Sequence, residues 1–357
     1  ANLKGDASKV AVTDGILNLD ESTLNFSLKA SDFSKPNLAF DLNLDQINLD
    51  RYLPPKSEKK PAAEKPSEKK PTDYAPLRRL ILEGRIRIGQ LIANKAKIQD
   101  LLLQIKARDG IFNLDPLKLA MYQGNVSGNG NFNVQTDTPK SSVNLDVENI
   151  QAGPLLKDVL EKDILEGVTN AQLKLSMSGE DAAMIKKTLD GNGQVRFNDG
   201  AIIGIDLAGM IRNVKAAFGL AQTPAQRPRT DFAELNAPFS IKQGLVHTPQ
   251  TSLKSPLIRV IAAGDANLVK ETLDFRVEPK VVATIKGQGD AEQRSGLMVP
   301  VLVSGTFSKP QFAPDLAGVA KKQLEEKILG SGKGEKLLDK KSLEDTAKGA
   351  LKSILGQ

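Results

Sequence analysis

Apolar and polar residues alternate along most of the chain, and this period of two predicts β-strands with one apolar face. Pairs that favour positive φ angles stand between several of these runs, at Asp14-Gly15, Asp109-Gly110, Asp199-Gly200 and Gln243-Gly244. Because such pairs suit tight hairpins, the sequence predicts a long antiparallel meander. The clearest alternating positions are Leu24, Phe26 and Leu28; Phe40, Leu42 and Leu44; Leu101, Leu103 and Ile105; Phe132 and Val134; Val143, Leu145 and Val147; Leu173, Leu175 and Met177; Val195 and Phe197; Phe239 and Ile241; Ile258 and Val260; Leu273, Phe275 and Val277; and Val299, Val301 and Val303.

The strand pattern also repeats over long distances in the chain. The heptapeptide Asp14–Asp20 returns in closely similar form as Asp109–Asp115, and Pro36–Leu53 aligns without a gap to Pro139–Leu156. Self-similar strand units of this kind favour an extended sheet that grows by repetition.

Helices are predicted to be few. Asp206 is placed to cap a helix that runs to Phe218, with apolar residues at spacings of three and four and Gly219 after its end. Two more helices, at about 315–329 and 342–355, form a basic amphipathic tail. Between the first strands and the rest of the chain, residues 54–73 are rich in Lys, Glu and Pro and predict a disordered linker.

The net charge of +6 does not indicate a nucleic-acid-binding face. The stretch from Lys56 to Lys70 contains six Lys and three Glu, and the chain from Lys321 onward contains nine Lys and six acidic residues. These two segments account for the whole excess, so the remaining body is neutral. A nucleic-acid interface needs a basic face on the folded domain, and we therefore expect no nucleic-acid partner.

The residues offer little for catalysis or metal binding. The chain contains no Cys and no Trp, its aromatic content is 4%, and His247 is its one histidine. A catalytic triad or a His-rich zinc site needs more, so we interpret His247 as structural or solvated and expect no catalytic residue, metal or cofactor. The sequences Gly128-Asn129-Gly130 and Gly191-Asn192-Gly193 resemble fragments of phosphate loops, but they lack the following helix and lysine, and we expect turns or sheet edges there.

The apolar strand face admits two interpretations from periodicity alone. It can pack against a second sheet as the core of a sandwich, or it can line an open groove for acyl chains. Periodicity by itself favours the sandwich.

The order of motifs from Leu77 onward resembles the AsmA family, in its C-terminal periplasmic region. The resemblance covers roughly residues 77–315, and residues 1–53 are similar to preceding strands of the same sheet. The motifs are Leu82–Leu91, Asp109–Leu117, Tyr122–Gly128, the Leu155-Leu156 block, Gly191–Val195, Asp199–Leu207 and Val303–Asp315.

The resemblance implies a mainly β fold: a long, curled, antiparallel and repeating β-groove with a few short helices and the helical tail. It reverses the preference between sandwich and groove. The implied segments are 1–53 as preceding groove strands, 54–73 as the linker, 74–315 as the family-like groove region and 316–357 as the tail. It further implies a periplasmic protein anchored to the bacterial inner membrane. The chain starts at Ala1 without Met, and we expect an upstream anchor or export signal.

The implied function is a passive, bridge-like hydrophobic conduit for phospholipid acyl chains in outer-membrane biogenesis, without enzymatic activity. The alternative is a scaffold or assembly factor for outer-membrane proteins or lipopolysaccharide, in which strands or the helical tail bind other envelope proteins and no lipid is carried. A β-rich enzyme acting on polysaccharide is a third, weaker interpretation. The predicted lining residues are Leu101, Leu103, Ile105, Phe132, Val134, Val143, Leu145, Val147, Leu173, Leu175, Val195, Phe197, Phe239, Ile241, Ile258, Val260, Phe275, Val301 and Val303.

Overall fold

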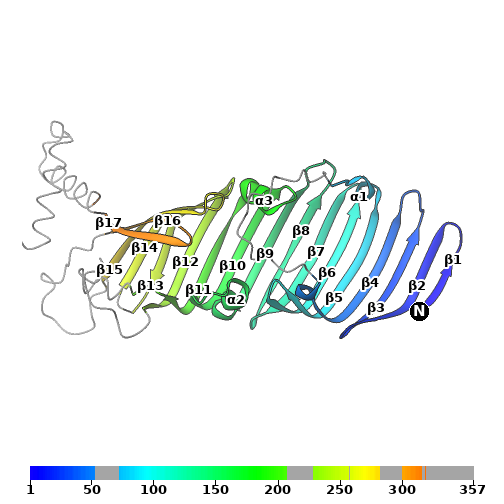
Figure 1. Cartoon of the computed structure of the whole chain (residues 1–357), viewed down its shortest axis with the longest axis horizontal. Coiled ribbons are helices and arrows are strands. Elements are labelled where there is room, and N and C mark those ends of the chain that lie inside the picture. The colour runs from blue at the N-terminus through cyan, green and yellow to red at the C-terminus, as the bar shows by residue number, and fades with distance from the viewer. Residues whose placement is uncertain (53–71, 207–227, 257, 282–299, 316–317, 319–357) are drawn as a thin grey trace, which may run out of the picture.

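The fold, seen in a computed structural model that describes residues 1–52, 72–206, 228–256, 258–281, 300–315 and 318, is one long β-sheet. Its seventeen strands pair with their neighbours in chain order, and β1 and β17 are not joined to each other, so the described sheet is open (Figure 1). The predicted mainly β fold on one curled sheet is therefore confirmed. The strands are β1 (Asn2–Gly5), β2 (Lys9–Leu19), β3 (Ser22–Ser31), β4 (Asn37–Asn48), β5 (Ile81–Ala93), β6 (Ala96–Arg108), β7 (Ile111–Met121), β8 (Gly124–Asn133), β9 (Lys140–Gln151), β10 (Leu165–Ser178), β11 (Asp190–Ile203), β12 (Arg229–Lys242), β13 (Leu245–Lys254), β14 (Ile258–Asn267), β15 (Thr272–Val281), β16 (Val301–Thr306) and β17 (Lys309–Pro314).

One strand pair departs from the predicted antiparallel meander. Strands β4 and β5 are parallel, with Asn37 opposite Ile81 and Asn48 opposite Ile92. A parallel pair cannot be closed by a tight turn, because the second strand must begin at the rim opposite to the one where the first strand ends. The predicted linker falls between these two strands, and its residues 54–71 lie outside the described part of the chain.

The turn predictions are half right. Asp109-Gly110 and Gln243-Gly244 each form a two-residue hairpin turn with positive φ at both residues. Asp14 and Asp199 also have positive φ, but they lie inside β2 and β11, beside irregularities in the strand pairing. The predicted turns at these two positions are wrong. A β-bulge, like a tight turn, can require a residue with positive φ, so the Asp-Gly signal does not distinguish the two.

The two Gly-Asn-Gly sequences are likewise not turns or edges. Gly128 and Gly130 lie inside β8, and Gly191 and Gly193 lie inside β11. A Cβ built on Gly128 would come within 2.1 Å of the Asn144 carbonyl oxygen. The neighbouring backbone therefore requires glycine at that position, a close approach that a single sequence does not reveal.

Short helical segments stand at the rims of the sheet. The aligned repeat Pro36–Leu53 and Pro139–Leu156 corresponds to a strand followed by a helical turn in both copies, β4 with η1 and β9 with α2. The segments α1, α2 and α3 were not predicted, whereas the predicted helices after Asp206 and in the tail lie outside the described residues. The helical segments are η1 (Leu49–Arg51), α1 (Ala75–Arg79), α2 (Ala152–Leu160) and α3 (Ala182–Thr188).

The described strands do not build a sandwich. Each strand packs substantially only on its sheet neighbours and, for β5, β6 and β10, on a helical segment. The main buried cluster lies toward the C-terminal end of the sheet and consists of Phe232, Leu253, Ile258 and Val260. Most other apolar side chains of the sheet are therefore covered only in part by protein.

The buried cluster makes a stability prediction. Replacing Ile258, which is 2% exposed, by Ala should lower the local free energy of unfolding by about 2–5 kcal/mol, because it removes buried methyl groups and leaves a cavity. Hydrogen exchange of the β13–β15 amides measures this change. The matched control Ile16→Ala, at a side chain that is 65% exposed, should change stability by less than about 0.5 kcal/mol. Equal effects at the two positions would contradict this account of the cluster.

Candidate functional site: an apolar groove

One face of the sheet carries an unbroken row of apolar positions. Residues directly opposite each other on paired strands point to the same face, so the strand register identifies the row. It runs from β1 to β15 and contains only apolar side chains or glycine. Its members, in strand order, are Leu3, Val12, Leu28, Phe40, Gly84, Ile105, Leu114, Gly130, Val143, Leu175, Gly191, Ile241, Val246, Ala266 and Leu273.

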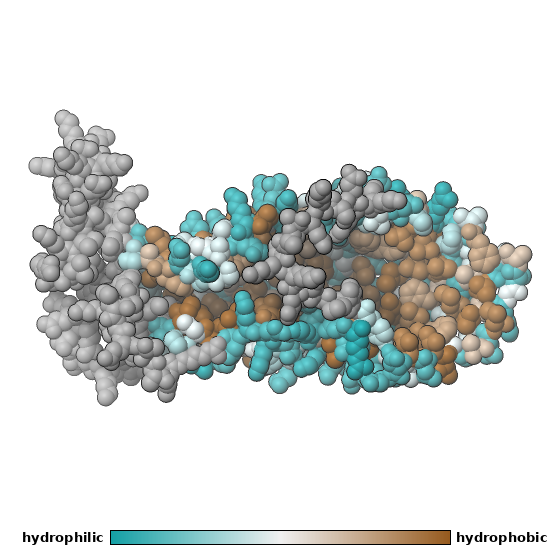
Figure 2. All heavy atoms as spheres, in the orientation of Figure 1, coloured by the Kyte–Doolittle hydropathy of each residue, from teal (hydrophilic) through white to brown (hydrophobic). Residues whose placement is uncertain are grey.

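A second row lies beside the first, from β3 to β12. We call the face that carries both rows the groove, and the opposite face the polar face. Figure 2 shows apolar residues gathered along a hollow in the middle of the molecule, between hydrophilic rims. The second row consists of Phe26, Leu42, Ile86, Leu103, Leu117, Gly128, Leu145, Leu173, Gly193 and Phe239.

The strand register places the predicted lining residues on the groove face, except Val134, which lies just after the end of β8. Most of them, including Leu103, Leu145 and Leu173, are half-buried. A half-buried apolar side chain still presents surface to a guest, which a side chain in a closed core does not. Their role in holding lipid remains a prediction.

Three predicted lining residues are covered by the protein itself. Val134 is fully buried beside α1, where the Arg78 Nε donates a 2.7 Å hydrogen bond to its carbonyl oxygen. Ile258 and Val260 belong to the buried cluster near the C-terminal end of the sheet. These three side chains support the groove, but they have no free surface to offer a ligand.

Several groove positions were absent from the predicted set. Ile86 and Ile88 on β5 alternate with Arg85 and Arg87, so their signal was present in the sequence. Leu114 and Leu117 are three residues apart, and both reach the groove because the pairing of β7 shifts between them. This bulge interrupts the period of two that identifies a strand face.

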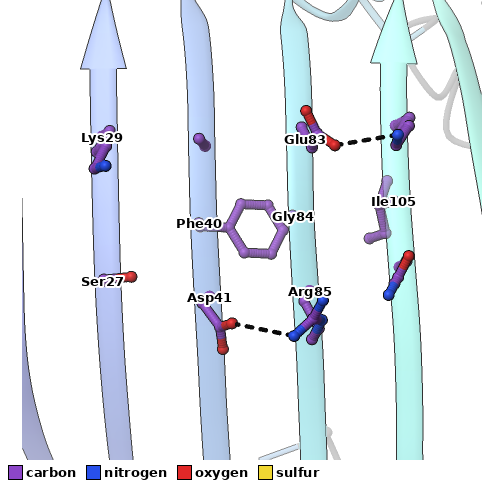
Figure 3. Close-up of a pocket in the computed structure, with 11 residues that line it drawn as sticks. Ser27, Lys29, Phe40, Asp41, Glu83, Gly84, Arg85 and Ile105 are labelled. Atoms are coloured by element: carbon purple, nitrogen blue, oxygen red, sulfur yellow. Dashed lines mark ion pairs between the residues drawn. The ribbon is translucent and has the colours of Figure 1, made fainter.

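The polar face is crossed by ion pairs. At the parallel junction, Asp41 on β4 accepts a 2.6 Å hydrogen bond from Arg87 on β5 and lies 3.9 Å from Arg85. Farther along, the Lys106 ammonium is 3.1 Å from Glu83. The Asp41–Arg85 pair, drawn in Figure 3, and the Glu83–Lys106 pair border a shallow depression. Its volume is about 310 Å³. Charges of both signs line this depression, so it favours no single charged ligand.

Helix α2 is held to the groove rim by polar contacts. The Asp158 carboxylate lies 3.0 Å from the Lys97 ammonium and accepts a 2.9 Å hydrogen bond from the Tyr122 hydroxyl. The hydrogen bond from Lys97, which has the larger effect, and the hydrogen bond from Tyr122 hold the pKa of Asp158 below its usual value. Asp158 therefore stays ionised at neutral pH, and the contact weakens only in acid, as the pH falls through that lowered pKa.

The candidate catalytic groups are dispersed. His247 lies on the polar face with its Nδ1 2.7 Å from the Asp265 Oδ1, and both side chains are exposed. Across the described ranges, no group of three or more His, Cys, Asp or Glu side chains is arranged to hold a metal ion. Within the same ranges, no helix combines the length and the hydropathy needed to cross a membrane.

An open curled sheet with one apolar face defines the class of protein. The model of the AsmA family matches residues 1–251, and the chain belongs to this family. It is also similar to Protein AsmA of Escherichia coli (strain K12), with 20% identity in an alignment 337 residues long that covers 87% of this chain and 53% of that protein. The chain thus spans about half the length of this curated relative. No solved structure matches the chain significantly. Membership of the family suggests a protein associated with the bacterial envelope.

The assignment of the two faces predicts a difference between adjacent positions of β9. The chain has no cysteine, so Leu145→Cys and Asn144→Cys each introduce one labelling site. An environment-sensitive thiol dye should emit at shorter wavelength on the Leu145→Cys variant, because Leu145 faces the groove and Asn144 is exposed on the polar face. Equal emission from both variants, or the reverse order, would show that the faces are assigned wrongly.

Proposed function

We propose that the protein is a passive conduit for phospholipid in the bacterial envelope, and that it carries out no chemical step. Acyl chains lie in the groove, while the headgroups stay at its open side in contact with water. The observation that carries this proposal is the row of apolar positions that continues from Leu3 on β1 to Leu273 on β15 without a polar side chain.

A phospholipid needs such a surface to cross an aqueous space, because exposing its acyl chains to water is costly. Moving one ~16-carbon acyl chain into water costs roughly 13 kcal/mol, at about 0.8 kcal/mol per methylene. A continuous apolar row removes most of this cost, because the chain passes from one strand to the next without entering water. The row crosses fifteen strands, and fourteen intervals of about 4.8 Å between them give a length of roughly 67 Å. This exceeds twice the ~30 Å hydrocarbon core of a bilayer.

The difference between the two faces supports a conduit over a closed core. The polar face keeps its ion pairs and exposed side chains in water, so it needs no covering layer. The groove residues of the central strands, such as Leu103 and Leu145, are half-buried and are met by no second sheet among the described strands. A sheet that hides its apolar face only by curling leaves room for a hydrocarbon guest.

The location follows from the same proposal. A conduit of this kind works in the periplasm, held at the inner membrane by an anchor upstream of residue 1, and contributes to outer-membrane biogenesis. In the scaffold interpretation, strands or the helical tail bind other envelope proteins, and residues 316–357 of the tail lie almost entirely outside the described part of the chain.

Photo-crosslinking tests the conduit directly. A photoreactive residue at Leu103 or Leu145, in protein expressed in bacteria, should capture phospholipid, because both positions face the groove. Leu145→Asp, combined with the photoreactive residue at Leu103, should abolish capture, since a charge then lies in the path of the acyl chain. Mass spectrometry of the adducts measures the captured lipid, and circular dichroism checks that the sheet is folded.

Asn144→Asp provides the matched control, because it places the same charge on the polar face and should leave capture at Leu103 intact. If wild-type groove positions capture no lipid, the conduit proposal is wrong. As an independent measurement, native mass spectrometry of protein extracted from envelopes distinguishes the two candidate functions. Retained phospholipid supports the conduit, whereas co-purified envelope proteins without lipid support the scaffold.

A further inference from the structure

Aromatic rings in the groove lie over glycines of the adjacent strand. Phe40 on β4 is directly opposite Gly84 on β5, and Figure 3 shows its ring extending across to that glycine. Phe26 on β3 is paired with Gly15 on β2 in the same way. Side chains of a strand normally stand roughly perpendicular to the sheet, so a ring that lies over its neighbour needs empty space beside it.

The glycine supplies that space. A Cβ built on Gly84 would lie 2.2 Å from the Phe40 Cζ, and its three nearest atoms all belong to that ring. At Gly15 the three nearest atoms are all ring atoms of Phe26, the closest at 2.5 Å. A side chain at either glycine would therefore displace the ring and leave the backbone in place.

The arrangement recurs along the sheet. Groove-facing glycines occur on every third strand from β2 to β14, at intervals of about 14 Å. At β5, β8 and β11, large apolar side chains from both neighbouring strands flank a position that has none. Gly15 has such a neighbour, Phe26, on one side, and Gly264 lies between Phe275 and Thr248. These glycines are Gly15, Gly84, Gly128 and Gly130, Gly191 and Gly193, and Gly264.

We propose that Gly84 determines which guests can pass this part of the groove, by keeping the Phe40 ring flat against the sheet. With the ring flat, an unbranched hydrocarbon chain has clearance to slide across β4 and β5. When the ring is displaced away from the sheet, it obstructs the path at the parallel pair of β4 and β5, where the antiparallel strands β1–β4 meet the antiparallel strands β5–β17. Phe40 and Gly84 are therefore specificity-determining residues of the conduit, and this inference rests on the proposed function.

The test uses Gly84→Ala in the full chain, with photoreactive residues placed separately at Ile86, on the same strand, and at Leu145, four strands away. Capture of phospholipid at Ile86 should fall by about tenfold or more, the effect of a 1.4 kcal/mol loss in affinity. Capture at Leu145 should persist. The double variant Gly84→Ala/Phe40→Ala should restore capture at Ile86, because it keeps the added methyl group but removes the displaced ring.

Gly153→Ala is the matched control. It adds a methyl group on helix α2, outside the two groove rows, where the nearest atom, Glu166 Cγ, lies 3.6 Å away in ordinary van der Waals contact. Capture at Ile86 and at Leu145 should survive this change. Wild-type capture at Ile86 in Gly84→Ala, or a loss that the double variant does not restore, overturns the inference. Absence of lipid from every groove position of the wild-type protein is a different result, which overturns the conduit itself.

Discussion

Strand register is the constraint on which the rest of the structure depends. Side chains alternate between the two faces, so a slip of one residue in any strand would turn its apolar set outward. Bulges correct the register where the spacing of apolar residues is irregular. In β7, Leu114 and Leu117 both reach the groove because the pairing shifts between them, and Asp14 accompanies a similar shift in β2. The apolar row survives from strand to strand because these local irregularities preserve it.

The sequence predicted the type of structure better than its connections. Period-two alternation identified most strands, and the 18-residue repeat corresponded to a strand followed by a helical turn in both copies. The parallel pair of β4 and β5 was not predictable, because nothing local to either strand specifies a partner reached through a long connection. Asp14 and Asp199 were mistaken for turn residues because the Asp-Gly signal reports a positive φ angle, which a bulge and a hairpin share. The glycines inside β8 are required by the close approach of the neighbouring strand's backbone, and this approach depends on the tertiary structure.

The sequence predicted which residues face the groove better than it predicted which of them are accessible there. Alternation correctly placed residues such as Leu103 and Leu145 on one side of the sheet, because every second residue of a regular strand points to the same face. It could not distinguish accessible positions from covered ones. Val134 is buried beside a short helix that no sequence signal indicated, and Ile258 is buried in a cluster with side chains of strands β12 and β13. Accessibility depends on these longer-range contacts.

The parallel junction has a consequence for how the sheet is assembled. Hairpins align their strands through the turn, but β4 and β5 have no such turn, so their alignment must come from side chains. The Phe40 ring fits over Gly84 and would collide with Leu82 or Ile86 after a slip of two residues, while Asp41 on the other face reaches Arg87. The Phe40–Gly84 contact on one face and the Asp41–Arg87 ion pair on the other thus fix the alignment of strands β1–β4 with strands β5–β17. The covalent connection between them is free to vary in length and composition.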